Sequence, residues 1–168
     1  MADFKKIVIE RDLNPYQSFL SSFFAGFAEL GLINQGSMNI VSKRAAEYQY
    51  SYLDARGYLA DLEVQDDCSE ESIRYHIDFI NSKLNLIGSY TLEKINQDEY
   101  IFRVAGNECR ICPKGVGGAA IKGTFCPIPS FYKNMVNLLI GKEIIKLQSS
   151  GIEKQGTTCN AVFMLSEE

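Results

Sequence analysis

Four cysteines in the last third of the chain are the residues whose type and spacing point most directly to chemistry. Cys109 and Cys112 form a C-x2-C pair, which Cys126 and Cys159 follow. Two thiolates at this spacing on a turn can converge on one tetrahedral metal ion, and two further cysteines can supply the remaining corners. The sequence therefore predicts a metal site built from Cys109, Cys112, Cys126 and Cys159.

Zinc is the first metal to expect at these cysteines. A structural zinc site takes four sulfur or nitrogen ligands and leaves no position open for water. Four thiolates also suit an iron–sulfur cluster, which stays open as an alternative. Unliganded reduced thiols and a disulfide or redox role stay open as well. The fifth cysteine, Cys68, lies in an acidic stretch, and we expect it to be a structural or surface thiol.

The composition is that of an ordinary globular protein. The chain has 168 residues, of which 46% are hydrophobic and 23% charged, and its net charge is −4. We expect one domain, residues 1–168. No apolar run approaches the ~20 residues of a membrane span. The first six residues lack the apolar core of a signal peptide, so we expect a cytoplasmic, reducing location. Lysine and arginine form no cluster that tracks phosphates, which argues against nucleic-acid binding.

Helical periodicity dominates the first half of the sequence. Apolar residues recur at helical spacing after Pro15, and Gly31 can end that helix. A second helix is expected over about 37–56. A third begins in the acidic segment 67–71, whose carboxylates suit a helix start. Its predicted apolar face consists of Ile73, Ile77, Ile80 and Leu84.

The second half of the sequence changes to alternation with a period of two. Residues 90–92 and 100–104 predict a hairpin, and 127–130 introduces another helix. Two more strands are expected over about 143–148 and 157–165. Together these elements predict an α+β fold, with N-terminal helices followed by ββαββ and a mostly antiparallel sheet packed against helices.

The cysteine-bearing segments resemble the 4-vinyl reductase domain family, more narrowly its stand-alone archaeal members described as hydrocarbon-binding proteins. The resemblance is carried by Cys109–Gly118, Gly123–Pro129 and Gly156–Cys159. The order of helices and strands is also similar over nearly the whole chain. The family is related to ligand-sensing domains of phenol-responsive activators, to nitric-oxide-sensing haem domains and to subunits of transport-tethering complexes.

The resemblance implies a zinc site. In the phenol-responsive activators zinc is bound by three cysteines and a glutamate, and Cys126 and Cys159 match the first and last of these ligands. The segment Ser150–Lys154 lacks the cysteine that the activators carry there. We therefore expect Cys109 and Cys112 to replace the two middle ligands.

The resemblance further implies a non-enzymatic module that binds a small hydrophobic or aromatic molecule as a sensor or carrier, and the habit of the related sensors implies a homodimer. Pockets for such molecules are mostly apolar. A core or an oligomer interface would use the same kinds of side chain. The candidate pocket residues are Phe23, Phe27, Tyr48, Tyr52, Phe131 and Tyr132.

Two other functions stay open. One is a reductase or accessory protein that acts on a tetrapyrrole vinyl group, although no dinucleotide fingerprint is present. The other is a scaffold or tethering subunit. The single histidine, His76, is expected on the flank of a helix rather than as a ligand or catalytic base. The glycine-rich segment Lys114–Gly118 lacks the context of a phosphate-binding loop, and a flexible turn is expected there.

Overall fold

The computed structural model describes residues 2–60, 62–65, 67, 69–113, 125–148 and 152–166. Helices come first and strands follow, and α6 (Ile128–Ile140) is the long helix that these residues place between the second and third strands. The elements in chain order are α1 (Ala2–Glu10), α2 (Pro15–Glu29), α3 (Gln35–Ala55), α4 (Glu70–Leu84), β1 (Thr91–Lys94), β2 (Glu99–Ala105), α6 (Ile128–Ile140), β3 (Ile145–Leu147), β4 (Glu153–Gln155) and β5 (Thr158–Leu165).

Side-chain caps define where α2, α3 and α4 begin. Asn14 and Gln17 form a reciprocal capping box at the start of α2, and Asn34 and Ser37 form another at the start of α3. Ser69 accepts a hydrogen bond from an amide of the first turn of α4. Each cap satisfies amides that the helix itself leaves unpaired and contributes about 1 kcal/mol.

The strands form one antiparallel sheet in the order β1-β2-β5-β3, and β4 also pairs with β5. β2 runs along one side of β5. On the other side, β3 pairs with residues 163–165 and β4 with residues 158–160. β5 therefore joins the whole sheet, and its residues 158–160, 163 and 164 are paired with a strand on both sides.

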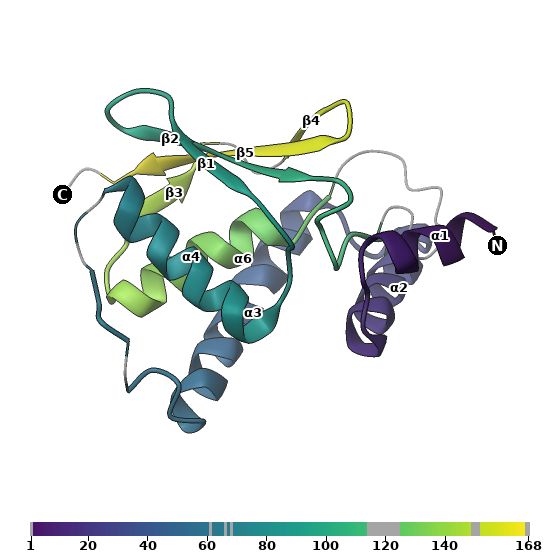
Figure 1. Ribbon diagram of the computed structural model, residues 1–168, viewed down its shortest axis with the longest axis horizontal. Helices are drawn as coiled ribbons and strands as arrows, with labels where there is room; N and C mark the ends of the chain where they lie inside the picture. The colour runs from purple at the N-terminus through teal and green to yellow at the C-terminus, as the bar shows by residue number, and fades with distance from the viewer. Residues whose placement is uncertain are drawn as a thin grey trace.

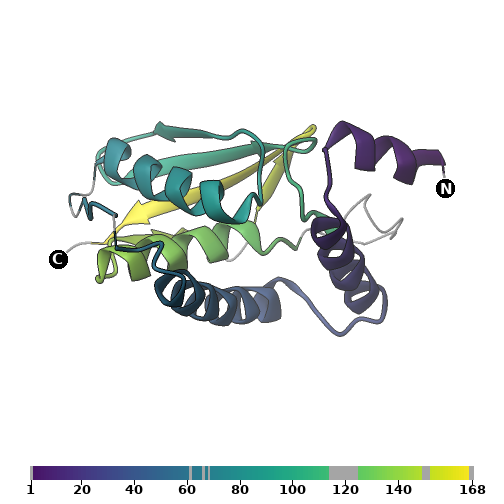
Figure 2. The same cartoon turned by 60° about the horizontal axis from the view of Figure 1, so that its bottom comes forward.

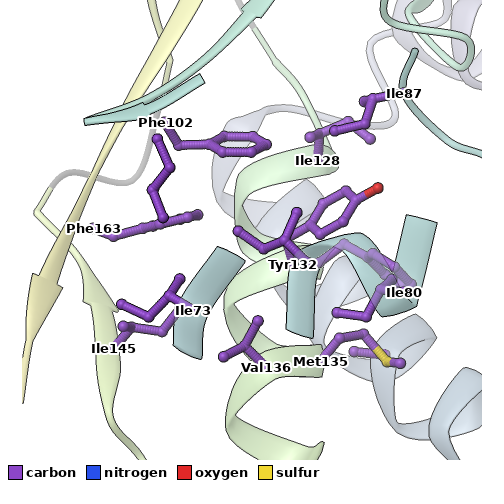
Figure 3. Close-up of a cluster of buried hydrophobic side chains, with 14 of the residues drawn as sticks. Ile73, Ile80, Ile87, Phe102, Ile128, Tyr132, Met135, Val136, Ile145 and Phe163 are labelled. Carbon is purple, nitrogen blue, oxygen red and sulfur yellow. The ribbon is translucent and has the colours of Figure 1, made fainter. Parts of the chain in front are cut away.

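Helices cover one face of this sheet. α4 and α6 pack against it, and α3 packs against α6 as an outer layer (Figures 1 and 2). In Figure 3, Phe102 of β2 and Phe163 of β5 extend from the sheet toward Tyr132 of α6. The rings of Phe102 and Phe163 stack with their centroids 5.4 Å apart. Burying each such side chain contributes about 1.5–3 kcal/mol, so this layer holds sheet and helices together.

The predicted α+β class is confirmed. Ile73, Ile77 and Ile80 of α4 are buried as the periodicity indicated. The sequence did not predict α1 or the three-residue strand β4, so the described elements after the N-terminal helices run in the order ββαβββ. Among the residues that the structure describes, no helix combines the length and apolar character needed to cross a membrane.

α1 and α2 form an N-terminal arm, residues 2–30, at the end of the molecule opposite the C-terminus (Figures 1 and 2). A short connection, residues 31–34, leads from this arm into α3. The arm therefore lies beside the sheet and the other helices rather than within their core.

Candidate functional site

The four cysteines singled out from the sequence line one cavity. Cys109, Cys112, Cys126 and Cys159 all contribute to the wall of a cavity of about 90 Å³. Cys109 and Cys112 follow β2, Cys126 precedes α6, and Cys159 lies on β5. None of the four is in a disulfide in this structure. The fold thus gathers sulfur atoms from three separate segments of the chain.

The Cys109–Cys112 turn is held by backbone pairing with the segment that follows α4. Cys109 forms an isolated antiparallel bridge with Ile87. The amide of Arg110 donates to the carbonyl of Leu86 over 3.0 Å. These contacts fix the first cysteine of the pair through the main chain, independently of its side chain.

Cys126 is held by the first residue of α3. Its amide donates to Oε1 of Gln35 over 2.8 Å, and Nε2 of Gln35 donates to the carbonyl of Cys126 over 3.2 Å. A glutamine side chain thus pairs with the backbone of Cys126 much as a neighbouring strand would. Only after this anchor does the chain enter α6.

Cys159 is held by the sheet. It lies opposite Val104 of β2 and opposite Lys154 of β4. Just before it, the carbonyl of Thr157 accepts a hydrogen bond of 2.7 Å from the amide of Gly106. A shift of register by one residue would turn Cys159 to the opposite face, because side chains alternate along a strand.

The thiols influence one another's ionisation. The pKa of Cys109 is raised well above its usual range, first by a hydrogen bond with Cys112 and then by burial and by nearby Cys126. Burial raises the pKa of Cys126, and the nearness of Cys112 and Cys159 adds to that shift. The thiols therefore stay protonated together unless a cation compensates for the charge of the thiolates.

The chemistry of this group fits a thiolate-binding metal. Backbone amides of Ile111 and Ile128 donate to the sulfurs of Cys109 and Cys126 and lower the pKa of each thiol. Such N–H donors stabilise thiolates around a metal. Within the described residues, no three ligand-type side chains lie close enough together to chelate an ion as they stand. An ion would have to draw the four sulfurs inward from the cavity wall.

The rest of the cavity wall is largely apolar. Among the described lining residues, Arg11 and Lys154 are the only charged ones. Nη1 of Arg11 donates to the carbonyl of Cys109 over 3.2 Å. Arg11 could not be identified from the sequence, because it lies 98 positions from Cys109 and belongs to no motif. Phe125, which also lines the cavity, could have been found as the neighbour of Cys126 in the segment Gly123–Pro129 that carries the family resemblance.

The six aromatic residues predicted to line a ligand pocket are not gathered in one place. Phe131 and Tyr132 are buried on α6. Tyr48 and Tyr52 lie on the outer face of α3 and are 73% and 50% exposed. Phe23 and Phe27 contact each other edge to face on α2, with ring centroids 4.5 Å apart. A single pocket formed by all six stays a prediction that would require the helices to rearrange.

His76 is more deeply buried than a residue on the flank of a helix. Its side chain has no exposed surface. Nδ1 lies 2.8 Å from the carbonyl oxygen of Ser72, while Nε2 has no hydrogen-bond partner in the described part of the chain. Burial lowers the pKa of His76. His76 does not line the cysteine cavity. It is a buried residue of α4.

Two segments discussed in the sequence analysis, Cys68 and Lys114–Gly118, lie outside the described residues. Asp67 and Ser69 precede α4 as expected of a capping region, and Ser69 Oγ donates to Asp67 over 2.8 Å. Glu70 and Glu71 occupy the first turn of α4, where negative charge is favoured.

Fold and site together define an α+β domain in which four cysteines surround one small cavity. The model of the MJ0207 family matches residues 31–165, and the chain belongs to this family. The matched region includes all four cysteines and excludes α1 and α2. Neither a search of curated proteins nor one of solved structures gave a match. The resemblance to the 4-vinyl reductase domain is not addressed by these comparisons and stays a prediction.

Proposed function

We propose that this chain is a non-enzymatic metal-containing binding module. Cys109, Cys112, Cys126 and Cys159 hold one zinc ion, which fixes the turn after β2 and the start of α6 against β5. The observation that carries the proposal is the convergence of all four cysteines on one cavity. Apolar side chains could fill this space if packing were its only function. The presence of four cysteines from three segments therefore favours a role in binding a metal.

A structural role for the ion follows from the donor set. Four thiolates fill the tetrahedral coordination of zinc and leave no position for a water nucleophile. When bound, the ion supplies positive charge that keeps the thiolates ionised despite their burial. An iron–sulfur cluster would use the same four sulfurs. A cluster absorbs visible light, whereas zinc does not.

The size of the cavity helps to separate metal binding from ligand binding. A volume of about 90 Å³ is well below the ~300 Å³ at which pockets for small organic molecules begin. The cavity thus suits an ion and the sulfurs around it. We propose that the small hydrophobic molecule binds next to the Cys109–Cys112 turn, against the apolar wall formed by Phe102 and Phe125, in a more open conformation.

Metal analysis of protein purified under reducing conditions tests the metal part of the proposal. We expect about one zinc per chain and no visible absorption band. Cys126→Ser should lose most of the metal, while Cys68→Ser, which removes the cysteine outside the set, should keep it. Full metal content in Cys126→Ser would remove Cys126 from the site, and metal-free wild-type protein would contradict the proposal.

Native mass spectrometry of the same sample tests the ligand part. Extra mass from a lipid-like or aromatic molecule supports a binding module. A flavin or a haem would instead favour a reductase. Absence of any bound molecule, together with a stable complex with another protein, would favour a scaffold.

A further inference from the structure

The helix α2 buries polar and small side chains and exposes large apolar ones. Its inward face is polar or small: Gln17, Ser21 and Ala25 are buried, and Ser21 has no exposed surface. Nε2 of Gln17 donates to the carbonyl of Asn85 over 2.6 Å. Ser21 Oγ donates to the carbonyl of Gln17 in its own helix over 2.7 Å, and the carbonyl of Arg110 lies 3.3 Å from the same Oγ. The buried face of α2 thus makes polar contacts with the end of α4 at Asn85 and with the turn that carries Cys109 at Arg110.

The opposite side of α2 is apolar and exposed. Tyr16 is 80%, Phe19 67% and Leu30 74% exposed. The rings of Phe19 and Phe23 stack with centroids 5.7 Å apart, so the aromatic side chains form a continuous row. We call this surface the outer face of α2; it consists of the exposed Tyr16, Phe19, Leu20, Phe23 and Leu30 and the half-buried Phe27.

The area of this surface is large enough for a stable protein contact. With roughly 150–250 Å² for each aromatic side chain, the exposed fractions correspond to about 600 Å² of side-chain surface per chain. Two such faces would bury about 1,200 Å², the lower end of specific protein–protein interfaces. An isolated helix of 15 residues is marginal in water, so α2 gains from being covered.

The lack of charged residues on most of α2 indicates which kind of partner can cover its outer face. No charged residue lies between Leu13 and Ala28. Helices that lie on membranes carry lysine and arginine on their polar face, whereas the polar face of α2 carries neither and is turned toward the protein. An acidic or basic partner would likewise find no complementary charge. An identical uncharged aromatic face is the surface that matches best.

We propose that the outer face of α2 is a dimer interface and that its occupant is a second copy of this chain. Two copies related by a two-fold axis place the same surface on both sides of the contact. Phe23 lies midway between Tyr16 and Leu30, at the centre of the contact. The proposal does not depend on the metal site, and the matched family region begins after this helix.

Opposite charges at position 23 test the proposal. Wild-type protein should show twice the chain mass of 18.9 kDa in sedimentation or light scattering. Phe23→Glu and Phe23→Lys should each weaken the dimer roughly a hundredfold or more, because like charges would meet near the axis. An equimolar mixture of the two variants should recover the dimer, which a variant that had unfolded could not do.

Two controls separate the contact from a general effect of charge. Ser22→Glu places the charge on the same helix but off the outer face, and Ile95→Glu replaces an exposed apolar residue in the β1–β2 turn. Both should remain dimeric. A monomeric wild type throughout the micromolar range would overturn the proposal, as would a dimer that Phe23→Glu leaves intact. A monomer that binds phosphatidylcholine vesicles through Phe23 would identify a lipid surface instead.

Discussion

The side chain of Gln35 and the backbone of Cys126 are joined by two hydrogen bonds, one in each direction. Gln35 is the first residue of α3, and Cys126 lies just before α6. The two helices pack against each other in the fold. The start of α3 therefore positions one wall of the cysteine cavity, although Gln35 lines no part of that cavity itself.

Replacement of Gln35 should loosen this wall. We expect Gln35→Leu to lower the free energy of unfolding by about 1–3 kcal/mol, because the amide and carbonyl of Cys126 lose their partner. Urea denaturation measures the change. Gln97→Leu, at an exposed turn position, is the matched control and should stay within about 0.5 kcal/mol of wild type. Equal stability of both variants would show that the paired hydrogen bonds do not hold Cys126.

Gly106 should tolerate no side chain. A Cβ atom there would lie 2.7 Å from the carbonyl oxygen of Thr157, a backbone atom that cannot move aside easily. We expect Gly106→Ala to cost about 1–3 kcal/mol and to disturb the strand that carries Cys159. Gly26→Ala meets nothing within 4 Å on α2 and should stabilise the helix by up to about 1 kcal/mol. Thermal unfolding of both variants tests the contrast.

His76 should make stability depend on pH. Burial lowers its pKa in the folded protein below about 6.5, its value in an unfolded chain. As the pH falls below about 6.5, the unfolded chain takes up a proton first, so the free energy of unfolding decreases; above that value it stays level. Since the chain has one histidine, His76→Met should remove this slope. The proteins with and without His76→Met should be compared in a Cys126→Ser background, because release of metal at low pH then does not contribute to the change in stability. A slope that survives His76→Met would assign the effect to other groups.

Removal of the metal should destabilise the protein. We expect a chelator to lower the free energy of unfolding of wild type by more than about 3 kcal/mol, because assembly of the ligands contributes folding energy. Cys112→Ser should already have this lower stability and should respond little to the chelator. Calorimetry with and without chelator measures both. An identical response of wild type and Cys112→Ser would separate Cys112 from the metal.

Much of the fold could be predicted because its helices and strands carry clear periodic patterns. Ile73, Ile77 and Ile80 repeat at helical spacing, and they are buried against α6 and the sheet. β2 alternates, and Tyr100, Phe102 and Val104 are the buried set. β4 escaped prediction because it has only three residues, all exposed, and it forms through pairing with β5.

A pattern shows which face of a helix is apolar but not what covers that face. The aromatic residues of α2 were predicted as one apolar stripe, yet they point away from the protein while Gln17 and Ser21 point inward. Periodicity is the same in both orientations. The cysteine set was accessible because its spacing carries a mechanism. Arg11 was not, because its place beside Cys109 depends on how the N-terminal arm packs.

X-ray absorption at the zinc edge tests the central claim most directly, because it reports the atoms bound to the ion. The account predicts four sulfur atoms at about 2.3 Å from one zinc per chain. Loss of one sulfur from that shell in Cys159→Ser would support the assignment of the last strand. A shell of nitrogen and oxygen atoms, or four sulfurs that persist in Cys159→Ser, would contradict it.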